Sequence, residues 1–78
     1  MERLYKMYRL YGNIKDLEMT GSNSMCDYYR LTLYLHIAGE WYPVTKEKGF
    51  SFYSKKEIYK ILKNDIINDL SKQGIKAR

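Results

Sequence analysis

The chain has 78 residues, of which 14 are Lys or Arg and 9 are Asp or Glu, so its formal net charge at neutral pH is +5. A chain of this length forms at most one domain, and its hydrophobic content of 45% is too high for a disordered protein. One Cys and one His exclude a disulfide framework and a zinc site of the usual kind. We therefore expect a single globular domain over residues 1–78, with no metal and no cofactor.

No apolar run approaches the roughly 18 residues that a membrane-spanning helix needs, and the first residues lack the apolar stretch of a signal peptide. We expect a cytoplasmic protein without a membrane partner, located in the host cell cytoplasm if it is encoded by a phage.

Charge and aromatic residues are distributed unevenly along the chain. Residues 1–45 contain five basic and five acidic side chains, whereas residues 46–78 contain nine basic and four acidic ones. Seven of the nine Tyr residues, together with Trp41, lie in the neutral part. The positions of the basic and aromatic groups relative to each other therefore become the central question for function.

The first twenty residues allow three interpretations. Residues 3–11 have the density of Tyr, Met and Leu that is typical of a strand, and Gly12-Asn13 is a hairpin dipeptide before residues 14–19. One long strand bent by a bulge at Gly12 is the second interpretation. A short helix is the third, because the apolar residues also have helical spacing. We favour strand, and we expect a loop over residues 20–27, which are rich in Gly, Ser and Asn.

Residues 28–37 alternate with a period of two and predict the central strand of a sheet, with one apolar face and one mixed face. The apolar face carries Tyr29, Leu31, Leu33, Leu35 and Ile37, and the mixed face carries Tyr28, Arg30, Thr32, Tyr34 and His36.

Residues 38–39, Ala-Gly, predict a two-residue turn into a second strand over residues 40–46, whose Pro43 belongs on a sheet edge because it lacks an amide donor. This register places Trp41 on the mixed face. A bulge at Gly39 would shift the register by one residue and turn Trp41 inward. The pairs expected without the bulge are Ile37 with Glu40, His36 with Trp41, Leu35 with Tyr42 and Leu33 with Val44.

The clearest helix signal lies in the C-terminal part. Ser54 and Glu57 have the spacing of a capping box, and Gly74 is a typical left-handed stop, so we predict a helix over residues 55–73. Its apolar stripe has spacings of three and four residues, and a stripe of lysines lies away from it. The apolar stripe is Ile58, Ile61, Leu62, Ile66 and Leu70, and the lysines are Lys56, Lys60 and Lys63.

These elements predict an α+β fold, a small two-layer domain. Its antiparallel sheet, a meander of three to four strands over residues 4–46, has the C-terminal helix packed on one face. One helix covers one face of a sheet, so we expect the other face to be open. The residues predicted on this open face, and expected to bind a partner, are Tyr28, Arg30, Tyr34, His36 and Trp41.

No catalytic constellation stands out. Cys26 has no basic neighbour in sequence that would stabilise a thiolate, and His36 lies ten residues away along the predicted strand. Two carboxylate pairs are candidates for acid–base or metal chemistry, but neither has further ligands in sequence. They are Asp65 with Asp69 on the helix and Asp16 with Glu18 on a strand. We therefore expect that the protein is not an enzyme.

Tyr, Trp and Arg dominate the energetics of protein interfaces. We expect a non-enzymatic interaction protein that binds a protein partner, or a second copy of itself as a homodimer, through the aromatic sheet face. Size and the bias towards Lys, Ile and Tyr fit a phage or mobile-element inhibitor of a host nucleic-acid-handling complex, comparable to anti-CRISPR proteins.

The alternative is direct binding of DNA or RNA, or of a nucleoprotein complex, by the electropositive surface of Lys56, Lys60 and Lys63. The predicted geometry separates these lysines from the aromatic face. On that face only Arg30, with Lys6 or Arg9, could add positive charge. This separation favours a protein partner.

Overall fold

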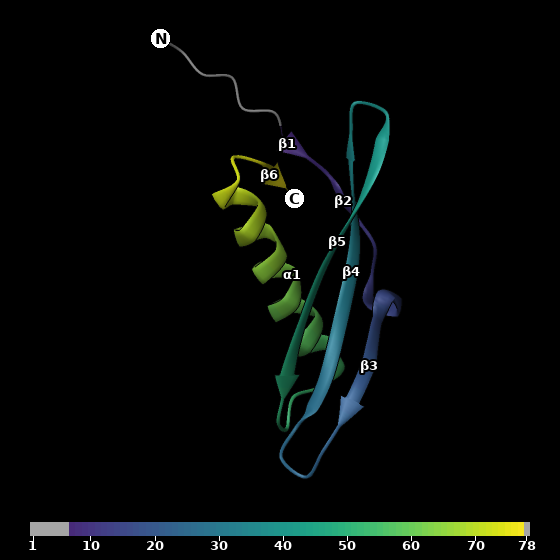
Figure 1. The fold of residues 1–78 in the computed structure, drawn as a ribbon, viewed down its shortest axis with the longest axis vertical. Coiled ribbons are helices and arrows are strands. Elements are labelled where there is room, and N and C mark those ends of the chain that lie inside the picture. Colours follow the sequence, from purple (N-terminus) through teal and green to yellow (C-terminus); the bar gives the residue numbers. More distant parts are fainter. Residues whose placement is uncertain (1–6, 78) are drawn as a thin grey trace.

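The computed structural model describes residues 7–77 and has the predicted α+β architecture, an antiparallel sheet in one layer and one helix in the other (Figure 1). In chain order the elements are β1 (Met7–Tyr8), β2 (Leu10–Tyr11), the 3₁₀ helix η1 (Ile14–Asp16), β3 (Leu17–Ser22), β4 (Asp27–Ile37), β5 (Glu40–Phe50), α1 (Lys55–Lys72) and β6 (Lys76–Ala77).

Strand β4 is the centre of the sheet. It pairs antiparallel with β5 along one edge, and with both β2 and β3 along the other. The order of β3, β4 and β5 is therefore the predicted meander. Strands β1 and β6 form a separate parallel pair, which lies near the C-terminal end of α1 in Figure 1.

The β4–β5 hairpin has the register expected without a bulge. Ala38 and Gly39 form the turn with φ angles of 51° and 81°, and positive values at both positions are those of a turn that follows the twist of the strands. All four expected pairs are present, from Ile37 with Glu40 to Leu33 with Val44. Trp41 therefore lies on the same face as His36, as predicted.

Strand β5 is longer than predicted, because it continues to Phe50 instead of ending near residue 46. Its last residues are three charged side chains in succession, followed by Gly49 and Phe50, so they lack the alternation of polar and apolar residues that marks a strand. In the structure, β4 offers a partner to every β5 residue down to the pair Asp27 and Phe50. Pairing along the full length of β4 outweighs the weak local pattern.

The N-terminal region follows the second of the three interpretations, one strand interrupted near Gly12, and the hairpin interpretation is wrong. Strands β2 and β3 lie one after the other along the same edge of β4. The intervening residues 12–16 stand opposite only Thr32 and Leu33, so the extra residues loop out as η1. The predicted sheet start near residue 4 lies outside the described residues, and the loop after β3 is shorter than expected, residues 23–26.

Local hydrogen bonds explain why the strand leaves the sheet at this point. The Asn13 side chain accepts a hydrogen bond from the Lys15 amide at 2.8 Å, and the Asp16 carboxylate accepts one from the Asn13 amide at 2.7 Å. This reciprocal pattern is a capping box. The backbone of Gly12, with φ 147°, passes so close to Leu33 that a Cβ atom would collide with the Leu33 side chain.

Helix α1 confirms the C-terminal prediction to within one residue. The Ser54 hydroxyl accepts a hydrogen bond from the Glu57 amide at 3.2 Å, and Glu57 accepts one from the Ser54 amide at 3.4 Å. Gly74 has the expected positive φ, 83°.

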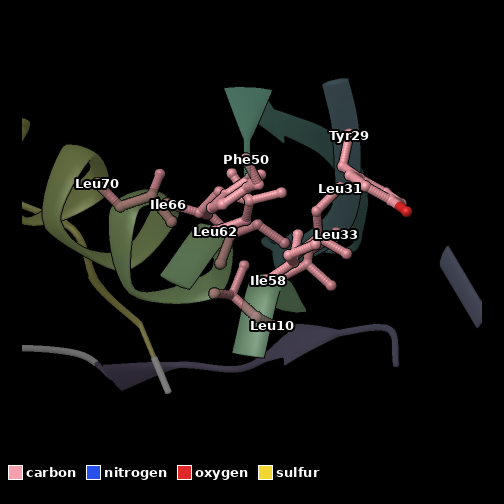
Figure 2. Packing of buried hydrophobic residues seen from close by; sticks show 10 residues of the cluster. Leu10, Tyr29, Leu31, Leu33, Phe50, Ile58, Leu62, Ile66 and Leu70 are labelled. Atoms are coloured by element: carbon pink, nitrogen blue, oxygen red, sulfur yellow. The ribbon is translucent and has the colours of Figure 1, made fainter. Parts of the chain in front are cut away.

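The core lies between α1 and the apolar face of β4, where the side chains of the two layers point toward one another (Figure 2). Helix α1 contributes one side chain per turn, and Ile61 of the predicted stripe is half-buried. The buried residues are Leu10, Tyr29, Leu31, Leu33, Leu35, Phe50, Ile58, Leu62, Ile66 and Leu70.

The molecule is elongated, with extents of 53 × 24 × 17 Å and a radius of gyration of 14.3 Å. A compact domain of the same length would have a radius of about 11.5 Å. The two-layer core therefore leaves much of the sheet exposed.

We predict that Gly12→Ala lowers the free energy of unfolding more than Gly39→Ala does. Both glycines have a positive φ, at which a side chain costs about 1–2 kcal/mol, but only Gly12 has a neighbour within the volume of a new Cβ atom. Urea denaturation of the two variants measures the difference. Equal losses would show that Leu33 moves aside without cost.

Candidate functional site

The candidate site lies on the open face, the sheet face that α1 leaves uncovered. Tyr34 and His36 of β4, Trp41 of β5 and Tyr11 of β2 gather there into what we call the aromatic cluster. Tyr11, Tyr34 and Trp41 are between 41% and 54% exposed, and His36 is also exposed. Three strands therefore present a continuous group of accessible rings.

The rings of the cluster support each other. The indole of Trp41 stacks on the His36 imidazole with a centroid distance of 4.4 Å, and meets the Tyr11 ring edge-on at 5.0 Å. Tyr34 lies in register between Tyr11 and Pro43. Because each ring is anchored on a paired strand and touches a neighbour or stands in register with one, the cluster loses little freedom when it binds.

Arg30 lies on the open face but is held by acidic neighbours. Its guanidinium is 3.3 Å from the Glu18 carboxylate and 3.9 Å from the Glu47 carboxylate, which come from the strands on either side. Thr20 also donates a hydrogen bond to Glu47. The positive charge of Arg30 is therefore offset within its own row, and it adds no free positive charge to the aromatic cluster.

Tyr28 lies at the far end of β4, in register with Gly21 on one side and Gly49 on the other. Its ring occupies the space above both glycines, 3.0 Å from where a Gly49 Cβ atom would be. At about 3.3 Å per strand residue, Tyr28 and His36 are about 26 Å apart. The five predicted partner-binding residues thus share a face, but only three of them come together.

The sequence interpretation missed Tyr11, because its strand could be placed in three ways. It also left Arg9 as one of several candidates. The Arg9 guanidinium carbon lies 5.5 Å from the centroid of the Tyr11 ring, a cation–π distance. Arg9 therefore brings positive charge to the edge of the aromatic cluster, while Lys6 lies outside the described residues.

The predicted lysines share one flank of α1. Lys56 and Lys60 are exposed, and the half-buried Lys63 places its ammonium 5.9 Å from the Tyr59 ring centroid. Lys60 is nine residues from Asp69, which is two and a half turns, so the lysines face away from the acidic residues of the helix. We call this side the lysine flank.

The carboxylates of the opposite flank are engaged with β5. The Lys46 ammonium donates to Asp69 at 2.9 Å, and the Lys48 ammonium donates to Asp65 at 2.8 Å. The hydrogen bond to Asp69 and its negative charge raise the pKa of Lys46, and the same hydrogen bond lowers the pKa of Asp69. This pair of aspartates therefore joins the helix to the sheet and is not arranged as an acid–base pair.

The remaining candidates are also held apart. Cys26, which is half-buried, and His36 lie at opposite ends of β4. Asp16 caps η1, and Glu18 pairs with Arg30. Within residues 7–77, no three His, Cys, Asp or Glu side chains are arranged to hold a metal ion.

In the same part of the chain, no helix combines the length and the apolar character that crossing a membrane requires. No protein-family model, no curated protein and no solved structure matches the chain.

We predict that Lys46 and Asp69 are energetically coupled at neutral pH and uncoupled in acid. Because the pKa of Asp69 is lowered in the folded protein, its contribution is present above the ordinary aspartate pKa of about 4 and is lost as the pH falls through the lowered value. A double-mutant cycle of Lys46→Gln and Asp69→Asn, measured by urea denaturation across this range, tests the prediction.

Lys60→Gln is the matched control, since Lys60 has no ion pair within the described residues. Its effect on stability should not change between neutral and acid pH. A coupling between Lys46 and Asp69 that persists in acid would show that packing of the lysine stem, and not charge, joins the two residues.

Proposed function

We propose that the chain is a non-enzymatic binding protein that buries the aromatic cluster of its open sheet face against a protein surface. The observation that carries the proposal is the mutual packing of Tyr11, His36 and Trp41, which are exposed yet ordered by ring contacts across three strands.

The composition of the cluster supports a protein partner. Trp, Tyr and Arg are enriched among the residues that contribute most to interface affinity, because they bury large areas and keep a polar group at the rim. The aromatic cluster offers all three, with Arg9 at its edge. Its rings sit on strands instead of mobile loops, so binding orders few additional side chains.

The shape of the molecule supports the same proposal. The sheet face that α1 leaves uncovered exposes four large aromatic side chains, Tyr11, Tyr28, Tyr34 and Trp41. A partner protein, or a second copy placed by a two-fold axis, would cover this face. Inhibition of a host nucleic-acid-handling complex by a phage or mobile-element protein is the biological setting that we propose on composition alone.

Trp41→Ala should weaken binding about 30-fold or more, because truncation of a central interface residue costs about 2 kcal/mol or more. Sedimentation equilibrium measures self-association directly. For a foreign partner, tagged protein is used to capture binding proteins from the source cell, with nuclease added, and the captured proteins are quantified by mass spectrometry.

Phe52→Ala is the matched control, because Phe52 is fully exposed and lies in the loop after β5, whereas Trp41 lies at the start of that strand. It should retain self-association or the captured partner. A protein that stays monomeric at high concentration, and whose captured proteins are the same with and without Trp41, would contradict the proposal.

A further inference from the structure

A pocket opens at the edge of the sheet between β2 and α1. It has a volume of about 530 Å³, and it is lined by Arg9, Leu10 and Gly12 from the β2 region and by Lys63 from the helix. The pocket thus brings Lys63 of the lysine flank together with Arg9, which lies at the edge of the aromatic cluster. Sequence considerations alone placed these two surfaces apart.

Within residues 7–77, neither charged side chain of the pocket has an acidic partner. The ion pairs within the described residues involve Arg30, Lys46 and Lys48, and neither Arg9 nor Lys63 takes part in one. Each instead lies over an aromatic ring, which supports the side chain and leaves its charge in place.

Asp16, an acidic residue beside the pocket residue Gly12, is already engaged in a backbone hydrogen bond. The Asp16 carboxylate lies close to Gly12, and it accepts the hydrogen bond of the Asn13 amide at 2.7 Å that closes the η1 turn. It has no ion pair with Arg9 or Lys63. The pocket therefore contains two positively charged side chains, and the carboxylate of Asp16 beside it is hydrogen-bonded to the backbone.

We propose that Arg9 and Lys63 form a phosphate-binding pocket that takes a phosphodiester group of a nucleic acid backbone. Arg offers a planar set of donors that matches the oxygens of a phosphate, and Lys adds a point charge. This proposal goes beyond the protein-binding function. The two sites share Arg9 at the edge of the aromatic cluster, but the protein interface depends on Trp41 and its ring contacts, and the pocket depends on the charges of Arg9 and Lys63.

A repeating anion fits the surroundings of the pocket. Lys60 and Lys56 precede Lys63 by three and seven residues on the same flank of α1, so the row extends about 10 Å along the helix. Both are exposed and without an ion pair in the described part of the chain. A nucleic acid carries one charge per nucleotide at regular intervals, whereas the carboxylates of an acidic polypeptide lie on side chains of variable direction.

The test is fluorescence anisotropy with short labelled single strands of DNA and of RNA, titrated with the full chain at increasing salt. The variant carries Arg9→Gln and Lys63→Gln. Each phosphate contact contributes about 0.7 to the salt slope for a single strand, or about fivefold in affinity at 0.1 M salt. We expect the variant to bind about 25-fold more weakly, with a slope smaller by about 1.4.

The matched control carries Lys55→Gln and Lys72→Gln, which remove the same net charge from the two ends of α1. It should change affinity and slope much less. If circular dichroism shows that the Arg9→Gln, Lys63→Gln variant is unfolded, Lys63→Gln alone replaces it, and we expect this variant to lose about fivefold in affinity. Trp41→Ala should keep the affinity for the strands, which separates this site from the proposed protein interface.

Three results would overturn the proposal. The first is an absence of binding to the labelled strands at low salt. The second is an equal loss of affinity in the pocket and control variants, which would indicate diffuse charge only. The third is competition by polyglutamate as strong as by an unlabelled strand, which would indicate an acidic protein ligand. Preference for DNA or for RNA supports the phosphate pocket in either case and identifies the source of the backbone.

Discussion

The structure depends on the alternation of side chains along β4. This strand is paired on both edges, and its apolar residues Leu31, Leu33 and Leu35 are almost fully buried under α1. Since successive residues of a strand face opposite sides, burial of these leucines fixes Tyr34 and His36 on the side away from the helix. The surface that we consider functional is thus a direct result of core formation, and a shift of one residue would exchange the two faces.

Helix α1 adds a second division, between charges. Its apolar stripe faces the sheet, its aspartates are joined to Lys46 and Lys48 of β5, and its lysine flank faces the β2 edge. The ion pairs offset the positive charge on the β5 side. On the lysine flank of α1, by contrast, no ion pair of the described residues offsets the positive charge, and Lys63 lines the pocket there together with Arg9.

Much of this fold could be predicted from the sequence, because its strongest signals are local. The two-residue turn at Ala38-Gly39 fixed the pairing of His36 with Trp41, and the capping box at Ser54 fixed the start of α1. Where the outcome depended on long-range pairing, the sequence was insufficient. The extension of β5 to Phe50 and the placement of β2 beside β4 follow from pairing with β4, which the local patterns of β5 and β2 do not report.

The site was predictable only in part for the same reason. Tyr34, His36 and Trp41 share a hairpin, so their proximity follows from its register. Tyr11 and Arg9 join them from a strand whose position the sequence left open. Gly49, which makes room for the Tyr28 ring and the Cys26 side chain, carried a usable signal, since glycine inside a strand often marks a close approach.

The parallel pairing of β1 with β6 also shapes how the protein folds. Met7 and Tyr8 pair with Lys76 and Ala77, so two of the most distant described segments of the sequence meet in one short contact. Closing so long a loop carries an entropic cost, which two residue pairs and the packing of Tyr8 and Ala77 against the core offset. The β4–β5 hairpin and α1 rest on contacts closer in sequence, so this junction is expected to form after them and to open before them. The pairing of β1 with β6 is thus expected to join the two ends of the described chain only after the core has formed.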